Sequence, residues 1–192
     1  MKYLKMLGLA AVAAMALMAF GAGSASATKL CTVATEPCPN ADVTSIHAEL
    51  VGEAVLETKE GTVLNKCKKS TISGDVTNGA TGSPASGPVT VLTFGECERT
   101  VDVIKLGSMD VNNISGTFNG TVTVTGTEVT SQTPFGTCVF TATNLGTLLG
   151  GAPAKMSINA LVNRTSGLCP AEVRWTAEYK VTSPSALYVT HN

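Results

Sequence analysis

The six cysteines are the residues of this chain with the most chemistry to offer. They are Cys31, Cys38, Cys67, Cys97, Cys138 and Cys169. Metal sites and redox-active pairs usually place two cysteines about two to four residues apart, and the sequence has no pair so closely spaced. An even number of cysteines downstream of an export signal usually forms structural disulfides. We therefore expect a structural role, with no metal and no cofactor.

Sequence alone does not choose among the many pairings that six cysteines allow. The preferred set is Cys31–Cys38, Cys67–Cys97 and Cys138–Cys169, because each of these bridges closes a local loop. Loop-closure entropy gives the shortest loop about 2.5 kcal/mol and each longer loop about 3.5–4 kcal/mol of stabilisation as upper-range values. These contributions matter because the net stability of a domain is only about 5–15 kcal/mol.

Hydrolytic chemistry finds few candidate residues. The chain lacks a G-x-S-x-G motif, and His47 and His191 are the only histidines that could act as bases. His47 lies on the face of a predicted strand opposite its apolar neighbours, and His191 is the penultimate residue. We expect both histidines to be ordinary surface residues.

Carboxylate chemistry has candidates too, but they do not form a convincing pair. Glu49, Glu53 and Glu57 share one face of a strand only if no bulge occurs at Gly52. Acidic residues on the solvated face of a sheet usually serve solubility, whereas a glycosidase needs two carboxyl groups that face each other. We expect no catalytic residue and no enzymatic activity; a hydrolase with an unrecognised carboxylate site is a further alternative.

Carbohydrate binding generally needs exposed aromatic platforms. Trp175 and Tyr179 lie on the apolar face of the clearest strand, which predicts packing in the core. Tyr188 is the remaining candidate ligand contact.

The first 27 residues have the three parts of a secretory signal peptide. Lys2 and Lys5 precede an apolar run from 7 to 20, and Ala25-Ser26-Ala27 supplies the small residues that signal peptidase recognises. Cleavage is expected between Ala27 and Thr28, which leaves a secreted single domain at 28–192. No later apolar run is long enough to cross a membrane, so no transmembrane segment is expected after cleavage.

The charge pattern argues against nucleic acid as a partner. The chain has 13 basic and 14 acidic side chains, and its one basic cluster, 66–69, lies inside strand-like sequence. Phosphate binding needs a concentrated positive face. The partner is unknown from sequence; an extracellular protein or a glycan is the expected class.

The element that best defines the fold is the segment 172–182, EVRWTAEYKVT. Apolar and polar residues alternate along it, as in a strand with one buried and one solvated face. Other expected strands are 44–50, 53–58, 62–67, 71–77, 89–94, 101–106, 115–118, 121–125, 127–131, 137–143, 155–163 and 186–190. Short strands about every ten residues predict an all-β, disulfide-stabilised antiparallel fold. The expected architecture is a β-sandwich of immunoglobulin-like or jelly-roll topology, or a barrel.

Four segments, CTVATEPC, VTVLTFGEC, FGTCVFTA and LCPAEVRWTAEYKV leading to LYV, carry a resemblance. Together they resemble a group of small secreted, cysteine-containing all-β proteins predicted from actinobacterial genomes, to which no activity is assigned. The resemblance implies export and a β fold only. The sequence thus predicts a secreted, non-catalytic protein with a binding or structural role. A secreted carbohydrate- or lipid-binding module is the alternative.

Overall fold

A computed structural model describes residues 27–39, 43–143 and 146–191, and these residues form thirteen strands and no helix. The first six strands are β1 Thr28–Cys31, β2 Ser45–Glu57, β3 Val63–Asp75, β4 Ala85–Cys97, β5 Val101–Lys105 and β6 Ser108–Asn113. The next four are β7 Gly120–Thr125, β8 Thr127–Thr133, β9 Gly136–Ala142 and β10 Gly146–Leu149. The last three are β11 Lys155–Ser166, β12 Glu172–Ser183 and β13 Tyr188–His191. None of the described segments is a helix able to span a membrane.

Strand β12 has one buried and one solvated face, as its alternating sequence predicts. Val173, Ala177, Tyr179 and Val181 are buried, whereas Lys180 on the opposite face is exposed. Because successive side chains of a strand point to opposite faces, this pattern makes one face of the sheet apolar and the other polar. The same inward and outward alternation continues on β11, which pairs with β12 over nine residue pairs from 155 to 163.

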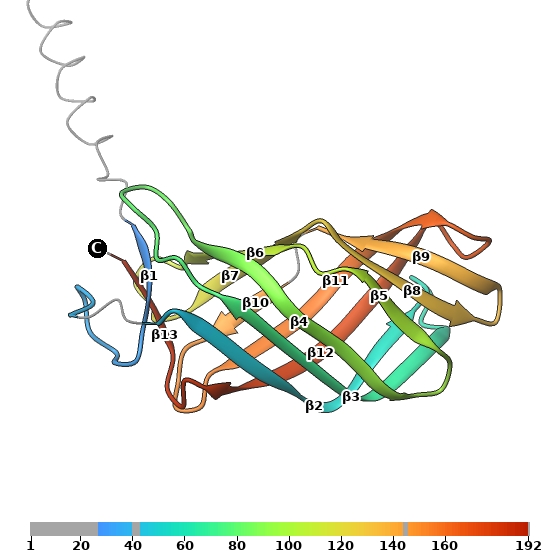
Figure 1. Ribbon diagram of the computed structural model, residues 1–192, viewed down its shortest axis with the longest axis horizontal. Helices are drawn as coiled ribbons and strands as arrows, with labels where there is room; N and C mark the ends of the chain where they lie inside the picture. The colour runs from blue at the N-terminus through green and yellow to red at the C-terminus, as the bar shows by residue number, and fades with distance from the viewer. Residues whose placement is uncertain (1–26, 40–42, 144–145, 192) are drawn as a thin grey trace, which may run out of the picture.

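The strands close into an antiparallel barrel (Figure 1). Eight strands form the ring in the order β10-β7-β6-β4-β3-β2-β12-β11, and pairing of β10 with β11 closes it. The prediction of an all-β antiparallel fold is confirmed, and its architecture is the barrel. The sandwich with immunoglobulin-like or jelly-roll topology, which the strand spacing also allowed, is not the arrangement found, because the sheet curls until its edges pair.

Closure of the ring depends on a close approach of backbones at Gly146. This glycine is the first residue of β10, the strand that closes the ring. It lies opposite Ile158 of β11 on one side and Val122 of β7 on the other. A Cβ atom at this position would collide with the carbonyl oxygen of Ser157. Only glycine fits such a contact, since every other residue carries a Cβ.

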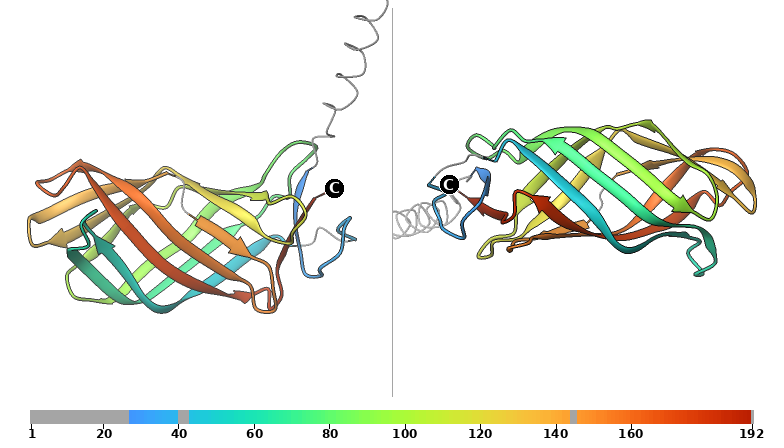
Figure 2. Two further views of the ribbon diagram at one scale, coloured as in Figure 1. Left: turned by 180° about the vertical axis from the view of Figure 1, so that it is seen from behind. Right: turned by 60° about the horizontal axis from the view of Figure 1, so that its bottom comes forward.

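Three strands extend the sheet beyond the ring. β11 pairs with β10 through residues 155–158 and with β9 through residues 162–166, so two strands share one edge of β11. β8 and then β5 follow β9. In both views of Figure 2 these strands wrap around the part of the barrel farthest from β1 and β13.

A two-stranded sheet of β1 and β13 lies at the other end of the barrel. Thr28 lies opposite His191 in this sheet, and its amide donates to the carbonyl of Ser83 at 3.0 Å. Asn78 Oδ1 accepts from the amide of Leu30 at 2.6 Å, which ties β1 to the loop before β4. The segment 78–87 is therefore partly a loop and partly the start of β4.

Two clusters of buried apolar side chains fill the interior. The larger cluster includes Met156, Tyr179 and Val181, and the smaller one surrounds Phe140. Trp175, the single tryptophan, is half-buried and packs against both clusters. The prediction that Tyr179 lies in the core is confirmed, and the side chain is 1% exposed.

Several expected strands have different limits in the structure. The pairs 44–50 with 53–58, and 62–67 with 71–77, are the single long strands β2 and β3. The expected strand 115–118 is wrong, because this segment forms a turn in which Thr117 bonds back to Ile114. β1, β6 and β10 were not expected; each is short, and the apolar residues of β6 and β10 do not form a recognisable alternating run.

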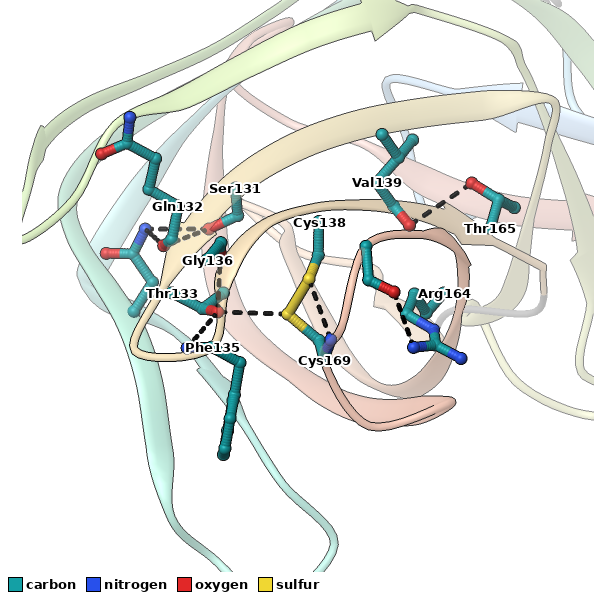
Figure 3. Close-up of a disulfide and its surroundings, with 12 residues drawn as sticks. Ser131, Gln132, Thr133, Phe135, Gly136, Cys138, Val139, Arg164, Thr165 and Cys169 are labelled. Carbon is teal, nitrogen blue, oxygen red and sulfur yellow. Dashed lines mark hydrogen bonds between the residues drawn. A yellow bond between two sulfur atoms is a disulfide. The ribbon is translucent and has the colours of Figure 1, made fainter.

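The structure contains disulfides Cys31–Cys38, Cys67–Cys97 and Cys138–Cys169, the same three local pairs that loop closure favours. Cys67–Cys97 joins neighbouring strands β3 and β4, in register with each other. Cys138–Cys169 links β9 to the loop between β11 and β12 (Figure 3).

We expect intact-mass spectrometry without reduction to give a value about 6 Da below that of the same chain with six thiols. Each of the three disulfides removes two hydrogens when it forms. Peptide mapping without reduction should then link the peptide of Cys138 to that of Cys169. A mass equal to that of the free thiols would contradict these bridges.

Candidate functional site

The two histidines lie on the outside of the fold. His47 on β2 is 2.7 Å from Ser73 Oγ through Nδ1, and its Nε2 is 3.7 Å from Glu49. His191, at the end of β13, lies 3.0 Å from Glu36 through Nδ1. Sequence reasoning missed the contact between His47 and Ser73, because it arises from cross-strand register that only the structure gives.

A serine beside a histidine and a carboxylate has the composition of an acyl-transfer site, but other parts are missing. Such a site needs preorganised N–H donors for the oxyanion. Ser73 lies in β3, which pairs with β2 on one side and β4 on the other, so the backbone amides around it are used in the two ladders. We therefore assign no reaction to this group.

The carboxylates of β2 face solvent and interact with basic residues of neighbouring strands. Gly52 has a φ of 78° and lies within a bulge, where the β2–β3 register shifts between Glu49 and Ala54. Glu53 is 3.6 Å from Lys66, and Glu57 is 4.0 Å from Arg174. Each of these carboxylates thus lies beside a basic side chain, and neither contact is the pair of facing carboxyl groups that a glycosidase needs.

The shifted carboxyl pKa values point away from general acid catalysis. A hydrogen bond from Lys69 and its positive charge lower the pKa of Glu96, and a hydrogen bond from Thr58 lowers that of Glu60. A glycosidase acid needs a raised pKa. Within the described part of the chain, no group of three or more His, Cys, Asp or Glu side chains is placed to hold a metal ion.

Tyr188 lines neither of the two cavities inside the barrel. It belongs to β13, and its ring meets that of Phe118 edge to face with 6.0 Å between centroids. The ring of Tyr188 therefore packs against another aromatic residue at the β1–β13 end of the barrel.

The feature that the structure adds is an apolar cavity of about 100 Å³ inside the barrel. An engineered cavity of roughly 150 Å³ with apolar walls binds benzene, so this volume is in the range of a single ring or a short hydrocarbon chain. Side chains from many strands line it, among them Leu56, Leu92, Phe94, Val129, Met156 and Trp175. None of the described residues that line it carries a charged side chain.

A second cavity of about 50 Å³ lies next to the first, because the two share several lining residues. The shared residues are Ile72, Val89, Met109, Val122 and Met156. The second cavity extends toward Leu30 of β1. The apolar interior therefore extends from the Trp175 region toward the β1–β13 end.

The larger cavity lies beside a gap in the sheet between β4 and β5. β4 pairs with β6 only over Ala85–Pro88, and β5 pairs with β8, so in the described sheet no ladder joins β4 to β5. The amide of Val89 donates to Gly107 at 3.0 Å and closes one end of this gap, and the connection 98–100 closes the other. We call the gap the β4–β5 opening.

The residues at the β4–β5 opening show that it leads inward. Leu92 and Phe94 of β4 line the cavity from one side, and Val101 and Leu106 line it from the other. All four are half-buried, although their side chains are apolar. Phe94 also contacts Trp175 edge to face, with 5.3 Å between ring centroids, so the tryptophan lies just inside the opening.

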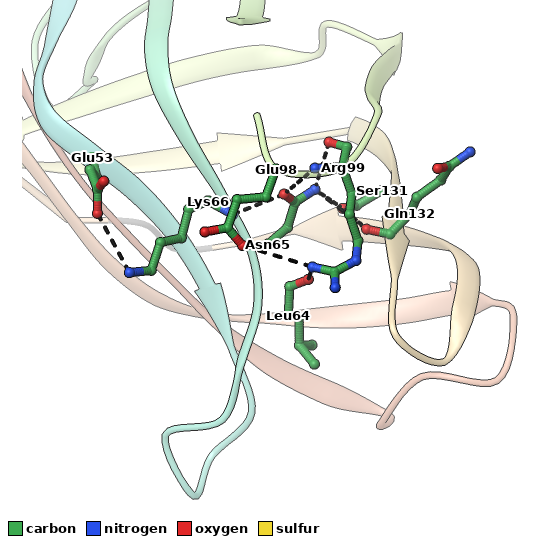
Figure 4. A network of polar contacts seen from close by, with 8 residues as sticks. All are labelled: Glu53, Leu64, Asn65, Lys66, Glu98, Arg99, Ser131 and Gln132. Atoms are coloured by element: carbon green, nitrogen blue, oxygen red, sulfur yellow. Dashed lines mark hydrogen bonds and ion pairs between the residues drawn. The ribbon is translucent and has the colours of Figure 1, made fainter. Parts of the chain in front are cut away.

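A polar cluster around Asn65 borders the cavity, because Asn65 and Ser131 belong to its lining (Figure 4). Asn65 Nδ2 donates to Arg99 O at 3.0 Å and to Ser131 Oγ at 2.9 Å, and its Oδ1 accepts from the amide of Arg99 at 3.1 Å. Ser131 Oγ in turn donates to Gln132 O at 3.1 Å. These bonds join β3 and β8 to the connection between β4 and β5.

A second polar contact lies within the barrel. The hydroxyls of Ser70 and Tyr179 are 2.9 Å apart, and the two residues are 4% and 1% exposed. Burial raises the pKa of Tyr179 to about 12, so its phenol is neutral at physiological pH. Sequence reasoning placed Tyr179 in the core but gave no sign of Ser70, which is an unremarkable serine in a polar run.

A scan of protein-family models finds no match, and searches of curated proteins and of solved structures find no significant match either.

Proposed function

We propose that this protein is an exported, non-catalytic binding protein that holds a small apolar molecule inside its barrel. The observation that carries the proposal is the apolar cavity of about 100 Å³ with half-buried aromatic walls at the β4–β5 opening. An apolar pocket with few polar groups is the usual form of a small-molecule site.

Packing energetics support an occupant. Protein interiors are close-packed, and full burial of a large apolar side chain contributes about 1.5–3 kcal/mol. Phe94, Leu92 and Trp175 are only half-buried although they point into the barrel. A ligand in the cavity would remove this apolar surface from water. Val91 and Ile104, 40% and 52% exposed on the outer faces of β4 and β5, give the opening an apolar surround.

Among the binding modules that the sequence suggested, these features favour a lipid-like ligand over a carbohydrate. Sugars need exposed aromatic platforms and many hydrogen bonds, whereas this lining is almost wholly apolar. Tyr188, the candidate sugar contact, packs against Phe118.

Export is the second part of the proposal. Three disulfides support folding in an oxidising compartment, in agreement with the leader-like first 27 residues. Cleavage between Ala27 and Thr28 would make the first residue of β1 the new N-terminus. The resulting amine would keep its donor role toward Ser83 O, so the domain 28–192 retains its contacts there.

Ligand binding can be tested through the single tryptophan. We expect ethylbenzene to shift the indole N–H resonance of Trp175 in ¹⁵N-labelled protein of residues 28–192, in a saturable way. Ala142→Leu should weaken this binding about tenfold, because Ala142 lines the cavity and the larger side chain fills part of it. The ligand then buries nearly two methylenes less, and each buried methylene contributes about 0.8 kcal/mol to binding.

Ala171→Leu is the matched control, since Ala171 is exposed in the loop before β12. This variant should bind ethylbenzene as the parent protein does. Absence of any saturable shift in the parent protein would refute the proposal, and so would unchanged affinity in Ala142→Leu.

A further inference from the structure

The buried hydroxyls of Ser70 and Tyr179 carry two donor protons between them, and their mutual hydrogen bond uses only one. Among the described residues, neither hydroxyl has another hydrogen-bond partner in the protein. A buried donor without an acceptor costs free energy, so a ligand that supplies an acceptor would be favoured.

The other amide and hydroxyl side chains that line the cavity have no proton to spare. Asn65 gives its two amide protons to Arg99 O and Ser131 Oγ. The hydroxyls that remain donate to backbone carbonyls, those of Thr127, Ser131 and Thr141 to Leu106, Gln132 and Asn163 respectively. The hydroxyl pair is therefore the fully buried source of a free donor proton in the described lining, beside the indole N–H of the half-buried Trp175.

Of the two hydroxyl residues, Tyr179 is the one that lines the cavity. The arrangement that serves a ligand has Ser70 donating to the phenol oxygen and Tyr179 donating into the cavity. The donor is uncharged, because burial keeps the phenol protonated, and none of the described lining residues is basic enough to balance an anion. A carboxylate or phosphate in this position would lose its hydration without compensation.

We infer that the ligand is a neutral, mainly apolar molecule with one hydrogen-bond acceptor, such as a ketone, ester or ether oxygen, which the Tyr179 hydroxyl binds. This inference rests on the proposed function, since it assigns the chemistry of the same cavity. It sets neutral oxygenated ligands apart from plain hydrocarbons and from free fatty acids.

Acetophenone and ethylbenzene separate the hydrogen bond from apolar binding, because they share one skeleton and differ in a carbonyl group. Both are titrated into ¹⁵N-labelled protein of residues 28–192, with the Trp175 indole resonance as the signal. In Tyr179→Phe we expect the affinity for acetophenone relative to ethylbenzene to fall about three- to tenfold, as for loss of one net hydrogen bond. Tyr188→Phe is the matched control and should keep the parent ratio, since it removes a phenol hydroxyl from a residue that lines neither cavity.

An unchanged ratio in Tyr179→Phe would overturn the inference while leaving apolar binding intact. Failure of both ligands to bind the parent protein would instead refute the proposed function. A second measurement needs no variant: the infrared carbonyl stretch of acetophenone bound to the parent protein should lie below its value in hexane. A stretch equal to that in hexane would also overturn the inference.

Discussion

Replacing Cys138 and Cys169 together by alanine is expected to lower the free energy of unfolding by about 4 kcal/mol. The bridge joins residues 31 positions apart, and loop closure of this length restricts the unfolded chain by about that amount. Both cysteines are buried, and Cys138 Sγ also accepts from the amide of Cys169 at 3.1 Å (Figure 3). Urea unfolding followed by tryptophan fluorescence measures the loss.

The Cys31–Cys38 bridge supplies an internal comparison, because its residues are only 7 positions apart. Its double alanine variant should lose about 2.5 kcal/mol. The difference between the two variants depends on loop length, so equal losses would contradict the entropic explanation. The longer bridge also holds the loop after β11 against β9, where these strands pair only over residues 162–166.

Asn65→Ala is expected to destabilise the fold by about 3 kcal/mol and to loosen the connection between β4 and β5. The side chain is 3% exposed and satisfies both the amide and the carbonyl of Arg99 (Figure 4). Its removal leaves these part-buried backbone groups without their partner, and an unpaired buried group costs about 1–3 kcal/mol. Urea unfolding gives the loss of stability, and hydrogen exchange at the Arg99 amide should become faster.

Asn159→Ala is the control for this substitution, because Asn159 is exposed on β11. Its effect should stay within about 0.5 kcal/mol of zero. The Asn65 cluster also borders the β4–β5 opening, so ethylbenzene should dissociate faster from Asn65→Ala than from the Asn159→Ala variant. A loss of stability as small as that of the control would show that the cluster does not hold this end of the barrel.

Part of the candidate site follows from sequence. The alternation of β12 places Trp175 and Tyr179 on the inner face, and this placement holds in the structure. Phe94 and Ser70 become part of the same region only because β3 and β4 pair in register, with Ser70 opposite Phe94. Tyr179 then reaches Ser70 across β2, a contact between residues 109 positions apart. Spacing along the chain carries no signal for such a contact.

The strands likewise divide into those that sequence predicts and those that only the pairing in the structure reveals. Long alternating runs such as 155–163 and 172–182 lie in the strands β11 and β12. The segment 115–118 was misread because β-branched and aromatic residues also occur in turns, where Thr117 bonds back to Ile114. β10 was missed because four residues hold too little alternation; its pairing with β7 and β11 makes it a strand.

The sequence by itself therefore determined the class of fold and the chemistry available to it. Residue alternation set which side chains of β12 face inward, since a strand has a period of two residues. Cysteine spacing made local bridges reasonable. Tertiary structure alone decided that the sheet closes through β10 and β11, that β4 and β5 do not pair with each other in the described sheet, and that a cavity lies behind them. These features depend on which strands meet across long stretches of chain, and local patterns do not encode the partner of a strand.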